Sequence, residues 1–437
     1  MLPVRGPLWQ VASPGHNSPV DYACLPMINP PVSQYDALIV GGRCAGASLA
    51  MLLARQGRRV VVLDRAQFPS DTLSTHFMWP RTTAALARWG LLDALAATGC
   101  PPIDTVNLHF GPVRVSGRPE AVEGTNAMFC PRRTVLDKLL VDSARRAGAE
   151  VRERTLVRDV IYEGDRVVGV RAVDADGAAF ECRSRLVVGA DGMTSTIADA
   201  VKAPIRRSHP SLTCGFYAYW IGVPTDGVEF YLRHGHDVLV FPTHDGLTCI
   251  WAGRANDQWE AYRAHREETY LASLDPSLVE RTRKGQRVTA FKGTHRLPNH
   301  VRQGAGPGWA LVGDAAYHRD PLTGMGIGDA FLGAQLLADA FRRGLDGDLD
   351  AELAAYAGDL EEKVGAAFDY TLASAALKDP APQVSLYRAI AARPDMTQTL
   401  MNVLGGSVSF RSLFNTRTLA SLRSGPSHGG GPVPPLS

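Results

Sequence analysis

One stretch near the beginning of the chain, residues 35–65, constrains the fold more than any other. It consists of an apolar run, a glycine-rich turn, a helical pattern of small and apolar residues, and a second apolar run that ends at Asp64. Short apolar runs are typical of buried parallel strands, and two parallel strands need a crossover connection such as this helix. The stretch therefore predicts a strand–helix–strand unit, whose turn contains Gly41, Gly42 and Gly46.

This turn has the chemistry of a dinucleotide site. A helix N-terminus favours a pyrophosphate through its free N–H groups and its dipole, and a carboxylate after the second strand can bind ribose hydroxyls. The turn departs from the pattern G-x-G-x-x-G, because Arg43 stands where the second glycine is expected. A side chain there widens the approach to the phosphates, and its positive charge can compensate. The alternative is an ordinary crossover without a nucleotide.

The composition is that of an ordinary globular protein. The 437 residues can bury a large core and are expected to form about two or three lobes. A charged content of 21% and a net charge of +2 give no reason to expect nucleic acid as a partner. We expect neither a transmembrane segment nor a signal peptide. The seven cysteines contain no Cys-x-x-Cys pair, which predicts a reduced, cytoplasmic chain without a metal site.

A polar loop follows Asp64 and contains Arg65 and His76. A loop in this position can fold back towards the middle of a bound cofactor. His76 could donate a hydrogen bond to the cofactor or a substrate, or act as an acid or base near neutral pH. It could equally tie the loop to a backbone carbonyl, and both interpretations stay open.

Three later elements of the sequence begin or end at a charged residue that could contact a ligand. Arg133 begins a helix, from which it can reach a phosphate or stay in solvent. Apolar strands end at Asp191 and at Asp314, so both carboxylates are expected at the carboxyl edge of a parallel sheet, where ligands of doubly wound folds bind. A long helix follows Asp314, and its N-terminus can stabilise negative charge on a cofactor ring. The loop before this helix contains Pro321, Gly324 and Gly326.

Between residues 213 and 253 the sequence contains four aromatic-rich runs separated by turn residues, which predict a mixed or antiparallel sheet. One face of such a sheet could wall a pocket for a flat or hydrophobic ligand, although aromatic residues in strands are also ordinary core. Residues 256–286 are expected to be helical, and 287–297 to return the chain to the main sheet. The candidate pocket residues are Tyr217, Tyr219, Phe230, Phe241 and Trp251.

Three motifs occur in one order along the chain: Gly41-Gly-Arg-Cys-Ala-Gly46 with Asp64, Gly189-Ala-Asp-Gly192, and Gly313-Asp-Ala-Ala316 followed by Pro321-Leu-Thr-Gly-Met-Gly326. In this order and spacing they resemble the group A flavin monooxygenases, the para-hydroxybenzoate hydroxylase superfamily, which also contains geranylgeranyl-reductase-like enzymes and flavin halogenases. Arg133-Thr-Val-Leu-Asp137 is similar to the Arg-x-x-Leu-Asp of that superfamily's FAD-contacting helix. The resemblance covers residues 35 to about 345.

The resemblance implies an α/β fold: a Rossmann-like FAD-binding domain (GR2-type, para-hydroxybenzoate hydroxylase fold) with an inserted mixed β-sheet substrate domain and a helical C-terminal region. The FAD-binding domain is expected in three parts, at 35–102, 120–205 and 301–345. The remaining expected units are a flexible extension (1–34), a hairpin of the substrate sheet (103–119), the substrate domain (206–300), the helical region (346–422) and a disordered tail (423–437).

The resemblance also implies roles for single residues. The glycine turn, with Gly41, Arg43, Cys44, Ala45 and Gly46, would surround the pyrophosphate of FAD. Asp64 and Arg65 would lie at the adenosine ribose, Arg133 and Asp314 at the middle of FAD, and Asp191 in a motif shared by FAD and the nicotinamide. The flavin ring would lie beside Gly324, Met325 and Gly326, with His76, Pro321 and Gly324 as the catalytic candidates.

The implied activity is that of an FAD-dependent monooxygenase. It would use NAD(P)H and O₂, through a flavin C4a-hydroperoxide, to hydroxylate or epoxidise a hydrophobic, aromatic or polycyclic small molecule of secondary metabolism. Thr196-Ile-Ala198 replaces the usual basic residues after the Asp191 motif, which leaves the nicotinamide contact open. The alternatives are a geranylgeranyl-reductase-like oxidoreductase, a flavin halogenase, whose Trp-x-Trp-x-Ile-Pro signature is absent, and a flavin-binding redox sensor.

Overall fold

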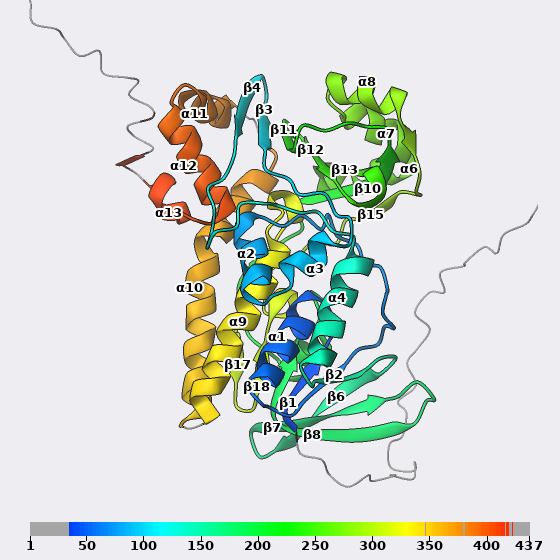
Figure 1. The fold of residues 1–437 in the computed structure, drawn as a ribbon, viewed down its shortest axis with the longest axis vertical. Coiled ribbons are helices and arrows are strands. Elements are labelled where there is room, and N and C mark those ends of the chain that lie inside the picture. The colour runs from blue at the N-terminus through cyan, green and yellow to red at the C-terminus, as the bar shows by residue number, and fades with distance from the viewer. Residues whose placement is uncertain (1–34, 346, 379–380, 416, 419–421, 423–437) are drawn as a thin grey trace, which may run out of the picture.

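The computed structural model describes residues 35–345, 347–378, 381–415, 417–418 and 422. The expected extension (1–34) and tail (423–437) lie outside the described residues. The described part contains two large sheets, which lie towards opposite ends of the molecule in Figure 1. The α/β fold class predicted from the sequence is confirmed.

The first sheet is built on the predicted strand–helix–strand unit. Strand β1 (Tyr35–Val40) pairs in parallel with β2 (Val60–Leu63) and with β8 (Ala179–Gly189). The sheet order is β17-β18-β8-β1-β2-β5, and the antiparallel β6 and β7 extend it beside β8. The other strands are β5 (Glu150–Arg152), β6 (Leu156–Glu163), β7 (Arg166–Val173), β17 (Ala305–Gly306) and β18 (Trp309–Leu311).

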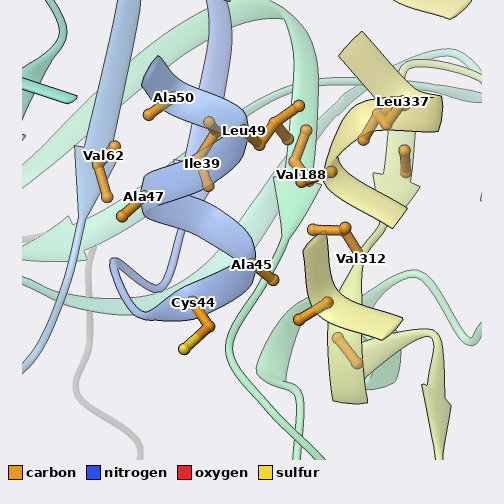
Figure 2. Close-up of a cluster of buried hydrophobic side chains, with 14 of the residues drawn as sticks. Ile39, Cys44, Ala45, Ala47, Leu49, Ala50, Val62, Val188, Val312 and Leu337 are labelled. Atoms are coloured by element: carbon orange, nitrogen blue, oxygen red, sulfur yellow. The ribbon is translucent and has the colours of Figure 1, made fainter. Parts of the chain in front are cut away.

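Helix α1 (Cys44–Arg55) packs against the sheet and against two of the three long helices, α4 and α9, as Figure 2 shows for part of the interface. Ile39 of β1, Val62 of β2 and Leu49 of α1 are all fully or almost fully buried. The small residues along α1 let it approach the sheet and helix α9 closely, and removing such apolar surface from water is the main stabilising term. The long helices are α4 (Arg133–Arg146), α9 (Gly326–Leu345) and α10 (Leu349–Ala375).

The second sheet has the order β14-β10-β13-β12-β11-β3-β4, with β15 also beside β10. Its aromatic strands are those predicted between residues 213 and 253. The expectation for residues 287–297 was wrong: β14 and β15 pair with β10 and not with the main sheet, because they continue the antiparallel ladder of the second sheet. The strands are β3 (Val106–Phe110), β4 (Val113–Gly117), β10 (Thr213–Ile221), β11 (Val228–Arg233), β12 (His236–Pro242), β13 (Leu247–Ala255), β14 (Gln286–Arg287) and β15 (Lys292–Thr294).

The two faces of this sheet have different neighbours. One face is covered by helices α6 (Trp259–Ala264), α7 (Arg266–Ser273) and α8 (Pro276–Lys284). The other packs against residues 77–79 and the C-terminal helices, so it is turned towards the first sheet. The C-terminal helices are α11 (Ala381–Ala391), α12 (Pro394–Gly405) and α13 (Phe410–Leu413).

Short elements connect these parts. Strands β9 (Ile205–His209), β16 (Asn299–Arg302) and β19 (Tyr317–His318) form a third, small sheet. The short helices are α2 (Pro80–Arg88), α3 (Leu92–Ala96) and α5 (Thr196–Ala200). Among the described helices, we find none that combines the length and the apolar character needed to cross a bilayer. The six cysteines in this part are buried and form no disulfide.

Candidate active site

An elongated cavity of about 540 Å³ lies at the carboxyl ends of β1, β8 and β18. This volume is within the range of about 300–1,000 Å³ that small-molecule sites usually have. Residues from all three motifs line it, among them Gly41, Asp191 and Asp314. Segments that are hundreds of residues apart in the sequence therefore meet around one cavity.

The glycine turn brings three pieces of backbone into direct contact. Gly41 has a φ of +99°, and a Cβ atom there would lie 2.4 Å from the carbonyl oxygen of Ala190. A Cβ atom on Gly46 would lie 1.8 Å from the Gly41 carbonyl oxygen. Real Cβ atoms do not approach so closely, so both positions require glycine. Helix α1 begins directly after this turn without a side-chain cap, and Cys44 and Ala45 in its first turn line the cavity.

Asp64 fixes the turn from the neighbouring strand. Its carboxylate accepts hydrogen bonds from the backbone N–H groups of Gly42, at 2.6 Å, and Ala66, at 2.7 Å. A carboxylate can accept about four hydrogen bonds, so capacity remains for ribose hydroxyls. Asp64 and Arg65 both line the cavity.

Arg43, which stands at the position of the missing glycine, lines the cavity, and its guanidinium group is bound by neighbouring side chains. Its Nη1 atom lies 2.6 Å from Oδ2 of Asp137, and it also donates to the carbonyl and hydroxyl oxygens of Ser70. Arg133 donates to the other oxygen of Asp137. Burial by itself would lower the pKa of Arg133, but the charge and hydrogen bonds of Asp137, together with Cys44 and the charge of Asp314, more than offset this, so the pKa is raised. Arg133 is therefore a positive charge fixed in the cavity wall.

Asp137 is a site residue to which the sequence gave no role. It is fully buried at the start of α4 and also accepts from the Cys44 thiol, whose pKa is raised mainly by burial. The signal was present, because Asp137 is the last residue of the Arg-x-x-Leu-Asp pattern. One of its two charge partners, Arg43, comes from the glycine turn about ninety residues earlier, and this pairing is visible only in the fold.

The second and third motifs close the cavity from the other side. Asp191 caps helix α5 by accepting from Ser195 and from the backbone N–H of Ile197, and burial raises its pKa. Gly313 has a φ of +62°, and a Cβ atom there would lie 2.8 Å from Cβ of Ala45. This close approach places the neighbouring Asp314 beside the beginning of α1.

The far end of the cavity is formed by the loop before α9. Pro321, Gly324 and Gly326 line it, and a Cβ atom on Gly326 would meet nothing within 4 Å. Gly324 is in the left-handed region, at a φ of +63°. Met325 does not line the cavity, because its side chain is buried in the core below the second sheet.

His76 lies at this far end in a left-handed conformation, at a φ of +49°, and lines the cavity. Its Nε2 atom is 3.0 Å from the hydroxyl of Tyr219. Burial, followed by the positive charge of Arg133, lowers the pKa of His76 to about 3. The imidazole is therefore neutral at physiological pH, which favours hydrogen bonding over the acid–base role near neutrality.

The candidate aromatic residues separate into two groups. Tyr217 and Trp251, which are direct partners across β10 and β13, line the cavity. Phe230 and Phe241 do not, because they pack around Phe77, whose ring is stacked on Phe241 at 5.0 Å. Tyr219 contributes through its bond to His76.

A buried carboxyl group supports this wall. The indole Nε1 of Trp251 donates to Oδ2 of Asp237 at 2.9 Å. Asp237 is fully buried, and burial together with the nearby Asp320 raises its pKa to about 8. The sequence gave no sign of this contact, because the two residues meet only through the register of β12 and β13.

Comparison with known proteins identifies the family. The model of the FAD binding domain family matches residues 34–359, about three quarters of the chain. The chain belongs to this family.

Several relatives of the chain are named as reductases. The digeranylgeranylglycerophospholipid reductase of Methanocella arvoryzae is 25% identical over 77% of this chain and 85% of its own length. The menaquinone reductase of Mycolicibacterium smegmatis is 30% identical over 71% of this chain and 76% of its own length.

Solved structures show the same fold. The flavin-dependent brominase Bmp2 aligns with a TM-score of 0.76 at 20% identity, over 90% of this chain and 98% of its own. PqsL, a probable FAD-dependent monooxygenase from Pseudomonas aeruginosa, aligns with a TM-score of 0.66 at 20% identity, over 86% of this chain and 100% of its own. The family match, the relatives and the shared fold together confirm the resemblance to the para-hydroxybenzoate hydroxylase superfamily.

The residues around the cavity fit FAD. The uncapped start of α1 and the glycine turn suit a pyrophosphate, and Asp64 suits a ribose. The open space at Gly326 allows a planar ring to approach the loop before α9. The protein is therefore an FAD-dependent oxidoreductase of this superfamily.

Proposed function

We propose that this oxidoreductase is a monooxygenase that hydroxylates or epoxidises a compact, apolar, flat small molecule. The observation that carries the proposal is that Tyr217 and Trp251 form an aromatic wall in the same cavity that the loop of Gly324 and Gly326 lines. Flat aromatic side chains such as these suit a ring system in the substrate better than a polyprenyl chain.

The overall reaction balances as substrate, O₂, NAD(P)H and a proton giving oxygenated substrate, water and NAD(P)⁺. Bound FAD supplies the two-electron chemistry with the nicotinamide and with O₂. The residues of this chain bind and orient. The glycine turn, Asp64 and Asp314 would hold the nucleotide, and Arg133 would place a positive charge near its centre.

A second group of residues would exclude water from the end of the cavity where the reaction takes place. His76 and Tyr217 are both buried and uncharged, and Trp251 is held in place by Asp237. An enclosure that excludes water protects reactive oxygen chemistry from competing hydrolysis. Pro321 and Gly324 shape the backbone against which the flavin ring would lie.

The second candidate is a reductase that saturates a carbon–carbon double bond without O₂. It is favoured by the relatives, since the digeranylgeranylglycerophospholipid and menaquinone reductases match three quarters of this chain. Such a reaction delivers a hydride to one carbon and a proton to the other. The Tyr217 hydroxyl lines the cavity and would be the proton donor in that case.

The experiment that separates the candidates measures oxygen. Protein loaded with FAD is reduced anaerobically, once with NADH or NADPH and once with dithionite, and is then mixed with bicyclic aromatic compounds in the presence or absence of ¹⁸O₂. A monooxygenase gives product that carries one ¹⁸O atom and is formed only with O₂. A saturated product formed without O₂ supports the reductase, and the absence of product in every arm would overturn both.

A further inference from the structure

Two neighbouring side chains of the cavity have polar atoms without a partner. Nδ1 of His76 and the hydroxyl of Tyr217 are both buried, and neither makes a hydrogen bond of good geometry within the described residues, although the Ser74 backbone lies near both. The two rings meet edge to face, with centroids 6.2 Å apart. A buried polar group without a hydrogen-bond partner destabilises the folded protein. Two such groups beside one cavity indicate that their partner is a ligand.

The hydrogen-bond pattern assigns the proton of His76. In the part of the chain that the structure describes, the Tyr219 hydroxyl bonds only to Nε2 of His76, so its O–H group donates there. Nε2 is then the acceptor of the neutral ring, and Nδ1 carries the proton. Arg132 lies over the Tyr219 ring at 5.0 Å and helps to hold it in place. His76 therefore offers an N–H donor beside the O–H donor of Tyr217.

Both donors are uncharged at physiological pH. Burial keeps the pKa of His76 low, at about 3, and raises the pKa of Tyr217. The nearby cation Arg133 already forms an ion pair with Asp137. A carboxylate at this position would lose its hydration without gaining an unpaired positive charge, which is unfavourable in a buried site. An uncharged oxygen atom with free lone pairs meets no such penalty.

We propose that His76 and Tyr217 together bind an uncharged acceptor oxygen on the ring of the substrate, either a phenol hydroxyl or a quinone-type carbonyl. The ring would lie along Trp251, and the two donors would set which of its carbons is nearest to the flavin. This inference deepens the proposed function, since it places the ring in the same cavity. It concerns binding alone and can be tested without turnover.

The test compares four probes of similar shape: 2-naphthol, 1,4-naphthoquinone, naphthalene and 2-naphthoate. Their dissociation constants are measured with oxidised, FAD-loaded protein, from the change in flavin absorbance and tryptophan fluorescence. We expect the naphthol or the quinone to bind about tenfold more tightly than naphthalene, because a net hydrogen bond contributes about this factor. Which of the two binds better identifies the source of the oxygen.

Two variants distinguish the effect of the hydrogen-bond donor on Tyr217 from the effect of the aromatic surface. Tyr217→Phe is expected to remove about tenfold of the affinity for the oxygen-bearing probe and to leave naphthalene unchanged. Tyr262→Phe is the matched control, because the Tyr262 hydroxyl bonds to the Ala252 carbonyl on the other face of the same sheet. This control should leave all four constants unchanged.

A measurement on the unaltered protein covers the case in which Tyr217→Phe does not fold. The ¹⁵N chemical shifts of the His76 ring should show a proton on Nδ1, and only the oxygen-bearing probes should shift that signal. Equal affinities for naphthol, quinone and naphthalene, or tighter binding of the naphthoate, would overturn the inference. The proposed oxygenation could still hold in that case. Conversely, a failure to use O₂ would leave these binding results intact.

Discussion

The buried carboxyl group of Asp237, which supports Trp251, should make the free energy of unfolding depend on pH. The substitution Asp237→Asn should remove this dependence. Asp237 is fully buried. Its Oδ2 atom accepts a hydrogen bond from the indole of Trp251, and its Oδ1 atom has no hydrogen-bond partner within the described residues. Burial and the nearby Asp320 raise its pKa from 3.8 to about 8. We consider the variant Asp237→Asn, which keeps an acceptor for Trp251 but cannot ionise.

The sign follows from proton binding. In the unfolded chain Asp237 is ionised above about pH 4, whereas the folded protein keeps it protonated up to about pH 8. The folded state therefore binds the extra proton, and the stability contributed by this group is complete below pH 4 and is lost as the pH rises through 8. Each pH unit in this window corresponds to about 1.36 kcal/mol, so the three units from pH 5 to pH 8 give about 4 kcal/mol.

The assay is urea unfolding of FAD-loaded wild type and variant at pH 5 and pH 8. The free energy of unfolding of Asp237→Asn, relative to wild type, should increase by about 4 kcal/mol between these two pH values. Asp176→Asn, in an exposed turn between β7 and β8, is the control and should show no such increase. A difference that is the same at pH 5 and pH 8 would refute the assignment of a protonated Asp237.

Three further predictions concern the cofactor and His76. Gly46→Ala places a Cβ atom 1.8 Å from the Gly41 carbonyl oxygen, so the purified variant should contain little bound flavin. The flavin content is measured as the ratio of absorbance at 450 and 280 nm, and a variant with one flavin per chain would contradict the prediction. Asp64→Ala removes the acceptor of two backbone N–H groups and should weaken FAD binding at least about tenfold in a fluorescence titration, whereas unchanged affinity would speak against a ribose contact. Because the pKa of His76 is about 3, the affinity for 2-naphthol should be constant between pH 5 and pH 8, and a transition near 6.5 would show that the imidazole ionises there.

The elements that were predicted well are those whose signal is local. The strand–helix–strand unit of residues 35–65 is present with nearly the expected bounds, because strand periodicity and glycine positions depend on neighbouring residues. The same holds for the motifs at Asp191 and Asp314, which end parallel strands. Parallel strands of one sheet end at a common edge, so the convergence of these motifs follows from the topology.

Details of the cavity depended on contacts that no local pattern contains. All five candidate aromatic residues lie on one face of the second sheet, as alternation in strands predicts. Phe77 and Trp79, from the loop after Asp64, cover Phe230 and leave Tyr217 and Trp251 at the cavity. Arg43 is a second example, because its guanidinium group binds Asp137, which is distant in the sequence.

The sequence by itself determined the class of fold, the family and the convergence of three motifs on one cavity, because these follow from short motifs whose glycines and carboxylates act through nearby backbone. Only the tertiary structure decided which side chains face the reacting end, and in which protonation state. Those properties depend on burial and on partners from distant segments, such as Arg133 beside His76 and Asp320 beside Asp237. Burial is a property of the packed molecule, and it cannot be read from any one stretch of the chain.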